Sequence, residues 1–160
     1  MAYPLHLTGL TPKEAVADAL YRACNSYDTQ DLALHDSAFV NSPESFVSLD
    51  DTVMRGFESI RMVFHMVAPL DTSHMATTPR VQIHEGGKTA HMTATILSQH
   101  FKAGEGKEPT PGVERAFLTG GALYDLDLEL DETDALWKIK HFRIKALWRQ
   151  GDAKAVGLGM

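Results

Sequence analysis

The amino-acid sequence predicts an α+β domain in which a cone-shaped, curved and mainly antiparallel sheet wraps around three N-terminal helices. Helical periodicity is confined to the first half of the chain, whereas residues 72–149 are dominated by long strand-like segments. Short turns separate these segments, as in antiparallel hairpins. Helices followed by a run of strands are typical of the α+β class, and a sheet that curls around helices leaves an open mouth for a small ligand.

Three helices are expected in the first half of the chain. An N-cap threonine, a proline at the first helical position and a glutamate at the third open a helix over residues 11–26. Asp28 follows it and is able to cap a second helix over residues 29–37, which is one interpretation of this carboxylate. An apolar stripe predicts a third helix over residues 57–68, which stops at a proline.

Strands account for most of the remaining chain. The two longest are joined by Gly86 and Gly87, which supply the positive φ values of a tight hairpin turn. A polar segment over residues 103–112, rich in glycine and proline, is the best candidate for a mobile lid. The expected strands span residues 39–49 with an interruption, 52–55, 72–85, 88–102, 113–130 and 136–149.

Length and composition indicate a single domain. The chain has 160 residues, of which 44% are hydrophobic, enough to bury roughly two thirds of the surface that the unfolded chain exposes. We expect this domain to span residues 1–150, and residues 151–160 to form a flexible tail because they show no periodicity. The net charge of −6 and the lack of a Lys/Arg cluster argue against nucleic-acid partners and anionic membrane surfaces.

Targeting signals and cysteine content point to the cytoplasm. Cys24 is the only cysteine, so no internal disulfide is possible. The first residues lack the charged region and apolar run of a secretory signal, and no apolar run approaches the roughly 18 residues of a membrane span. We therefore expect a cytoplasmic protein without a membrane segment.

The long hairpin brings two histidines close together, His74 and His100. Counting back from its turn places Ser73 opposite His100. Strict alternation directs His100 toward the apolar face and His74 away from it. Pro79 cannot donate a hydrogen bond to a strand ladder and favours a bulge. We therefore predict a β-bulge at residues 77–79, which turns His74 toward the same pocket as His100.

Several short motifs occur in an order that resembles the SnoaL-like branch of the nuclear-transport-factor-2-like (NTF2-like) superfamily, and within it the scytalone dehydratases and their fungal relatives. The resemblance implies an NTF2-like cone, also described as a cystatin-like α+β barrel, and chemistry that needs no cofactor or metal. The motifs that carry it are Tyr27-Asp28, Thr72-Ser73-His74-Met75, Gln99-His100, and the closing strand with Trp137-Lys138-Ile139 and Trp148.

The resemblance implies catalytic roles for His74, His100, Asp28 and Tyr27, which match the dehydratase's two histidines, its aspartate and the adjoining tyrosine. A neutral imidazole can remove a proton next to a carbonyl and return it elsewhere. Our hypothesis is that Asp28 orients His100 as the base and that His74 is its acid partner. Tyr27 would polarise the substrate carbonyl directly or through water.

Five further residues are expected to bind the substrate. Asn41 and Tyr124 lie near positions where the dehydratase has a second tyrosine and an asparagine, so related chemistry on a different substrate is expected. His141 shares strand parity with inward-facing residues of the last strand. Phe64 and Met75 could wall an apolar pocket, although both are equally explained as core residues.

These observations predict a cofactor-independent lyase or isomerase, that is, a dehydratase, cyclase or rearrangement catalyst. Its partner would be an apolar carbonyl-containing small molecule from polyketide or terpenoid secondary metabolism. The alternative is a non-catalytic NTF2-like binding or assembly subunit, such as the small subunit of a ring-hydroxylating dioxygenase, whose cone would be filled with apolar side chains. In either case long exposed strands predict a homodimer packed sheet to sheet.

Other interpretations of the histidines remain open. A histidine at a strand end is commonly a solvated polar residue, and His84 and His91 are expected to be exposed on the outer face of the hairpin. A metal site formed by His74, His100 and Asp28 is chemically possible. No HxxxH or HxD spacing supports it.

Overall fold

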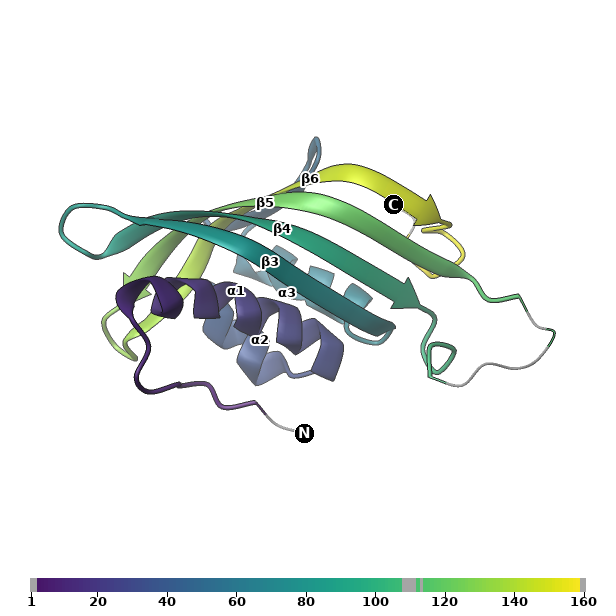
Figure 1. Ribbon diagram of the computed structural model, residues 1–160, viewed down its shortest axis with the longest axis horizontal. Helices are drawn as coiled ribbons and strands as arrows, with labels where there is room; N and C mark the ends of the chain where they lie inside the picture. The colour runs from purple at the N-terminus through teal and green to yellow at the C-terminus, as the bar shows by residue number, and fades with distance from the viewer. Residues whose placement is uncertain (1–2, 108–111, 113, 159–160) are drawn as a thin grey trace.

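The computed structural model of the protein describes residues 3–107, 112 and 114–158. Three helices cover one face of a six-stranded sheet, which confirms the predicted α+β class (Figure 1). The helices are α1 (Pro12–Thr29), α2 (Leu32–Ala38) and α3 (Phe57–Val67). The strands are β1 (Phe46–Leu49), β2 (Thr52–Arg55), β3 (Asp71–Ile83), β4 (Thr89–Phe101), β5 (Phe117–Asp131) and β6 (Leu136–Gly151).

The sheet is open, with the strand order β2-β1-β6-β5-β4-β3. All neighbours are antiparallel except β1 and β6, which run parallel. The core lies between α1 and the inner face of β4, β5 and β6, where small alanines alternate with larger side chains. Fully buried members of this layer include Val16, Leu20, Ala90, Met92, Leu126, Leu128 and Ile139.

A buried arginine attaches α1 to α2 and to β6. Arg22 is 3% exposed and pairs with Asp18 one turn earlier at 2.7 Å. Its guanidinium also donates to the carbonyl oxygens of Ser37 and Trp137, the latter at 2.7 Å. A buried cation is tolerated only when it is paired and hydrogen-bonded, so this network defines the position of α1 against the sheet.

The C-terminal end of α1 differs from the prediction. The helix continues to Thr29 rather than ending at Ser26, so Asp28 lies in its last turn. The N-cap of α2 is Asp31, whose carboxylate accepts a hydrogen bond from the Leu34 backbone N–H at 3.0 Å. The interpretation of Asp28 as the cap of α2 is therefore wrong, and its carboxylate is available elsewhere.

The predicted β-bulge in the long hairpin is confirmed. The register of β3 and β4 shifts between Thr77 and Arg80, so Thr78 and Pro79 of β3 together oppose the single residue Ala94 of β4. Thr78 has a φ of 52°, a left-handed conformation that is uncommon for a β-branched residue. The bulge reverses the faces of β3 on its two sides, as expected from the period of two along a strand.

This reversal decides which side chains of β3 face the helices. His74 turns inward, with its side chain 9% exposed. Met75 turns outward and is 44% exposed, so the expectation that Met75 lines the pocket is wrong. Thr72 lies opposite His100 in place of the predicted Ser73, because the bulge displaces the register by one residue.

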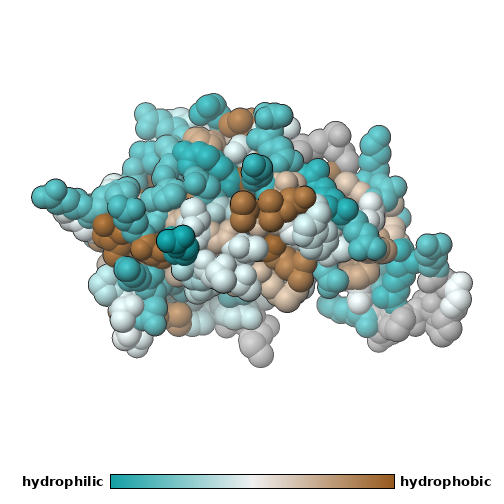
Figure 2. Space-filling view, turned by 45° about the horizontal axis from the view of Figure 1, so that its top comes forward, coloured by the Kyte–Doolittle hydropathy of each residue, from teal (hydrophilic) through white to brown (hydrophobic). Residues whose placement is uncertain are grey.

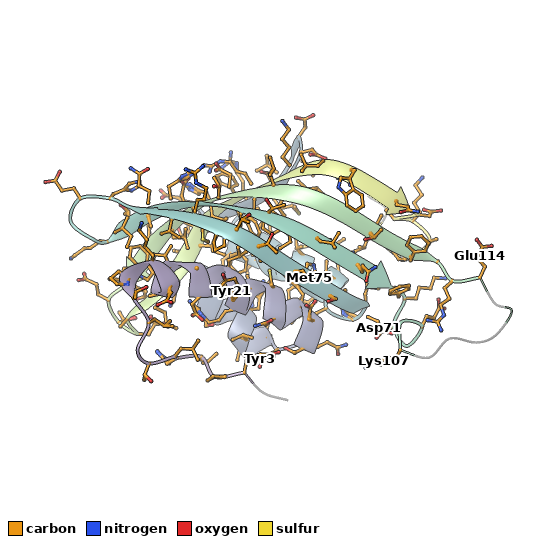
Figure 3. All side chains as sticks on the ribbon, viewed as in Figure 1. Tyr3, Tyr21, Asp71, Met75, Lys107 and Glu114 are labelled. Atoms are coloured by element: carbon orange, nitrogen blue, oxygen red, sulfur yellow. The ribbon has the colours of Figure 1, made fainter. Side chains whose placement is uncertain are left out.

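The two segments expected to be mobile are partly folded. Gly106, in the predicted lid, donates its backbone N–H to Asp71 at 2.7 Å, and Figure 3 shows Asp71 beside the loop that carries Lys107. Residues 108–111 of that segment lie outside the described residues. After β6, residues 152–158 form a hydrogen-bonded turn that buries Val156, rather than the loose tail that we expected.

Among the described residues, no helix has both the length and the apolar character required to cross a membrane.

Candidate active site

Asp28 and His74 form a largely buried pair where the end of α1 meets the start of β3. The Asp28 carboxylate accepts hydrogen bonds from the His74 ring Nδ1 at 2.7 Å and from the His74 backbone N–H at 2.8 Å. The Thr72 hydroxyl donates a third, at 2.8 Å. Because Nδ1 is bound to a carboxylate, it carries the proton, and Nε2 keeps a free lone pair.

This pairing corrects the predicted division of roles. Asp28 was expected to orient His100, but it binds His74. The reason is the placement of the helix: the last turn of α1 lies against the start of β3, where the bulge has turned His74 inward. Thr72, which the prediction did not include, completes the carboxylate's hydrogen bonds.

The environment of Asp28 keeps it ionised. Burial opposes the charge of the carboxylate, but the hydrogen bonds from His74, the positive charge of that ring when it is protonated and the bond from Thr72 outweigh it. The net effect lowers the pKa of Asp28 below its ordinary value. An ionised carboxylate at this position stabilises the imidazolium that forms if His74 accepts a proton.

His100 lies beside His74 and is 8% exposed. The two ring centroids are 5.2 Å apart and the planes are nearly perpendicular, at 84°. Burial, followed by the charge of His74, lowers the pKa of His100 to about 4, although the backbone of Leu118 acts in the opposite direction. His100 is therefore neutral at pH 7, and its buried Nδ1 has no hydrogen-bond partner among the described residues.

Tyr27 lies between the histidine pair and the aromatic floor of the cone. Its ring centroid is 5.6 Å from that of His74 and 5.8 Å from that of Phe64. Burial raises the pKa of Tyr27, so its hydroxyl stays protonated and can donate a hydrogen bond. Tyr124 is buried on the inner face of β5, and burial raises its pKa well above the ordinary value. Phe64 and Tyr124 are both buried, and their expected role in binding the substrate stays a prediction.

Two other residues expected to bind the substrate lie away from this pair. His141 is on the outer face of the sheet, where its Nδ1 is 3.1 Å from Asp127 and its ring stacks on Phe46. A second bulge, between Ile139 and His141, reverses the parity on which the prediction relied. Asn41 is exposed and lines a separate cavity of about 330 Å³ near the start of β6.

His35 is a buried histidine for which the sequence analysis identified no role. It is completely buried on α2 and its ring packs against Phe39 and Phe64, with centroids 4.8 Å away in each case. A signal was present in the sequence, because helical spacing places His35 on the same face as Leu34 and Ala38.

A second hollow lies on the outer face of the sheet. A groove of about 740 Å³ crosses the outer face of the sheet, bordered by Thr78, Thr95, Leu123 and Arg143 among others, and none of the histidines borders it. Within residues 3–107, 112 and 114–158, no group of three or more His, Cys, Asp or Glu side chains is arranged to hold a metal ion.

The fold defines an NTF2-like domain in which a cluster of polar side chains faces the interior. Residues 9–143 match the profile of the SnoaL-like domain, and the chain therefore belongs to this family. Terrestric acid biosynthesis cluster protein E of Penicillium crustosum is 40% identical over 158 residues, which cover 98% of this chain and 97% of that protein.

Solved structures share the fold at low sequence identity. A candidate scytalone dehydratase from Novosphingobium aromaticivorans aligns with a TM-score of 0.69 and 13% identity, over 87% of this chain and 86% of that one. The hexachlorocyclohexane dehydrochlorinase LinA-type3 from Novosphingobium barchaimii aligns with a TM-score of 0.65 and 14% identity, over 88% and 89% of the two chains. The predicted family and fold are thus confirmed.

Proposed function

We propose that the protein is a cofactor-independent lyase or isomerase that transfers a proton at a carbon atom next to a carbonyl group. The observation that carries this proposal is the buried Asp28–His74 pair, with its 2.7 Å bond and its free Nε2. An imidazole held in one tautomer by a carboxylate is a general base that works near neutral pH.

In the proposed reaction, Nε2 of His74 takes the proton from the carbon next to the carbonyl. The electron pair of the C–H bond moves to the carbonyl oxygen and forms an enolate, while His74 becomes an imidazolium stabilised by Asp28. Return of that proton to a hydroxyl on the adjacent carbon releases water, and its return to a different carbon gives an isomer. Both outcomes balance without an oxidant or a reductant.

Tyr27 and His100 have the supporting roles. The ring of Tyr27 packs beside that of His74, with centroids 5.6 Å apart, and its protonated hydroxyl would donate to the developing enolate oxygen. His100 is neutral at pH 7, so it acts as a hydrogen-bonding partner of the leaving or migrating group rather than as a second cation. Keeping His100 uncharged also leaves His74 as the only imidazole that becomes positive in the step.

The proposed substrate is an apolar carbonyl-containing small molecule of secondary metabolism, of polyketide or terpenoid origin. A relative with 40% identity over nearly the whole chain is a biosynthesis cluster protein. Structural neighbours include a candidate dehydratase and a dehydrochlorinase, whose names denote the elimination of water and of hydrogen chloride. The aromatic side chains packed beside the pair, such as Phe64, favour an apolar ligand over a charged one.

The alternative, a non-catalytic binding subunit, is less well supported by the interior of the cone. A structural subunit gains most by filling that space with apolar side chains. Here a carboxylate, two imidazoles and the phenol of Tyr27 lie together instead, and one imidazole nitrogen of His100 has no partner among the described residues.

A homodimer packed sheet to sheet is proposed as the assembly. Figure 2 shows apolar side chains gathered near the middle of one side of the molecule. Met75 and Leu97 pair across β3 and β4, and Leu123 is on β5; all three are exposed. Sedimentation at micromolar concentration would test this, and a monomeric mass would overturn it.

Two probes test the proposed chemistry without knowledge of the natural substrate. One is hydrogen–deuterium exchange next to the carbonyl of 1-tetralone in D₂O, followed by NMR. The other is the elimination of 5-nitrobenzisoxazole, which requires only a base. We expect the protein to accelerate at least one, and a variant with both His74→Ala and His100→Ala to accelerate neither. No acceleration of either probe by the unmodified protein would overturn the proposal.

A further inference from the structure

His35 has a buried nitrogen without a partner among the described residues, and its ring shares a neighbour, Tyr27, with the Asp28–His74 pair. Tyr27 is the common neighbour: its ring centroid is 5.6 Å from that of His74 and 5.8 Å from that of His35. The His35 ring is completely buried, and its Nε2 has no hydrogen bond among the described residues.

The Asp36–Arg61 salt bridge determines which ring nitrogen of His35 has a hydrogen-bond partner. Nδ1 lies 3.3 Å from Asp36, and Asp36 is held by two nitrogens of Arg61, at 2.9 and 3.2 Å. Asp36 and Arg61 are each about one-third exposed, so they mark the outward side of the ring. Nδ1–H donates outward to Asp36, and Nε2 therefore faces the interior as an acceptor.

The protonation state supports this assignment. Burial is the main cause that lowers the pKa of His35, and the nearby Arg61 and His65 act in the same direction, although Asp36 opposes them. The ring is neutral at pH 7, so Nε2 offers a lone pair and no proton. A buried acceptor without a donor costs free energy, whereas an apolar side chain among Phe39 and Phe64 would carry no such cost.

We propose that His35 is a specificity-determining residue, whose Nε2 accepts a hydrogen bond from a hydroxyl group of the substrate. The substrate would then carry two oxygen functions: a carbonyl near His74 and Tyr27, and a hydroxyl donor at the other end. Access to Nε2 requires the ring of Tyr27 or Phe64 to turn, a side-chain movement that commonly accompanies binding. This inference rests on the proposed function, because it places the ligand at the same site.

Matched ligands test the hydroxyl directly. The probes are hydroxy-1-tetralones that carry the hydroxyl at different positions of the aromatic ring, each compared with its methyl ether. The methyl ether keeps the size of the ligand but cannot donate a hydrogen bond. Calorimetric titration of the full chain should show at least one hydroxy isomer that binds about tenfold more tightly than its ether.

Variants of His35 assign that preference to Nε2. His35→Phe should abolish the preference, measured within the variant as the ratio of the affinities for the hydroxy isomer and its ether. His35→Gln, whose amide oxygen can replace the Nε2 acceptor, should restore part of the preference. If His35→Phe does not fold, His35→Gln against its apolar isostere His35→Leu gives the same comparison.

The outcomes separate this inference from the proposed function. A hydroxyl preference that is absent in the unmodified protein, or that persists in the apolar His35 variants, would overturn the role of His35. A preference that depends on His35, without any exchange or elimination, would keep that role and overturn the proposed chemistry. Exchange or elimination without a hydroxyl preference would keep the proposed chemistry and overturn the role of His35.

Discussion

Histidine–aspartate pairs occur on both faces of the sheet, and the inner pair is both shorter and more buried than the outer pairs. On the inner face, His74 and Asp28 are 2.7 Å apart, with side chains 9% and 20% exposed. On the outer face, His91 pairs with Asp125 at 3.1 Å, and these side chains are 36% and 45% exposed. His141 pairs with Asp127 at the same 3.1 Å.

Within the described part of the chain, the outer carboxylates also bind an arginine, which the inner carboxylate does not. Arg143 donates to both Asp125 and Asp127, at 2.7 Å each. Exposed charges of this kind are screened by water and salt. The inner carboxylate instead receives a backbone N–H and a hydroxyl, and its histidine faces a second, neutral imidazole. Proximity of His to Asp is therefore not sufficient evidence of a site; burial and a free ring nitrogen are also needed.

The largest effect is expected from removing the inner imidazole. His74→Ala should reduce the rate of probe exchange or elimination by about a hundredfold or more, within the usual range for acid–base catalysis. His91→Ala, its counterpart on the outer face, should retain nearly full activity. Steady-state rates of the two purified variants measure the difference, and equal rates would remove the distinction between the two faces.

His100→Ala is expected to lower the same rates on the order of a hundredfold, because it removes the polar partner beside His74. The control is Ser98→Ala, two residues earlier on the same face of β4. Near-normal turnover by His100→Ala would exclude this histidine from the reaction.

The carboxylates give a similar contrast of somewhat smaller size. Asp28→Asn preserves the shape of the side chain but no longer stabilises the imidazolium, so we expect a loss of about tenfold to a hundredfold. Asp125→Asn on the outer face should change the rate less than twofold. NMR of the ring nitrogens should show Nδ1 of His74 protonated in the unmodified protein, and a mixture of tautomers in Asp28→Asn.

Acid should destabilise the protein through His100. Its pKa is about 4 in the folded protein and 6.5 ordinarily, so the unfolded chain binds more protons between these values. Stability is therefore fully present above about pH 6.5 and is lost as the pH falls toward 4, by at most about 1.4 kcal/mol per pH unit. Urea unfolding at several pH values across this range gives the free energy of unfolding as a function of pH. This free energy should fall less steeply with decreasing pH for His100→Asn than for the unmodified protein, and equally steeply for Ser98→Ala.

The smallest effect is expected from a substitution at the bulge of β3, where the strand changes the face toward which its side chains alternate. Thr78 has a φ of 52°, which strains a β-branched residue. Thr78→Gly should relieve this strain and raise the free energy of unfolding by up to about 1 kcal/mol, with activity retained. Thr77→Gly, in the regular part of the strand, should lower it instead. Urea unfolding measures both variants. If both changes stabilised the protein, the claim that Thr78 is strained by its backbone conformation would be contradicted.

Features set by local chemistry could be predicted from the sequence. The capping box of α1 and the glycine turn of the long hairpin follow from residue preferences, and both are present. The bulge near Pro79 followed from a conflict between an apolar face and an inward histidine. Strand alternation and Pro79 together predicted a bulge, and the bulge in turn predicted that His74 and His100 lie close together.

Features set by packing could not be predicted in this way. Which histidine receives Asp28 depends on where the last turn of α1 lies against β3, and no local pattern encodes that contact. The second bulge, at Lys140, has no proline or glycine nearby that would predict it, so His141 was placed on the wrong face of the sheet. His35 was missed because a buried imidazole on a short helix has the same spacing as an ordinary core residue.

A double-mutant cycle tests most directly whether the inner pair acts as a unit. The rates of His74→Ala, Asp28→Asn and the double variant are compared with that of the unmodified protein, using whichever probe it accelerates. Groups that act together are strongly non-additive, so Asp28→Asn should cost almost nothing once His74 is gone. A double variant whose loss equals the product of the two single losses would contradict the claim that Asp28 acts through His74.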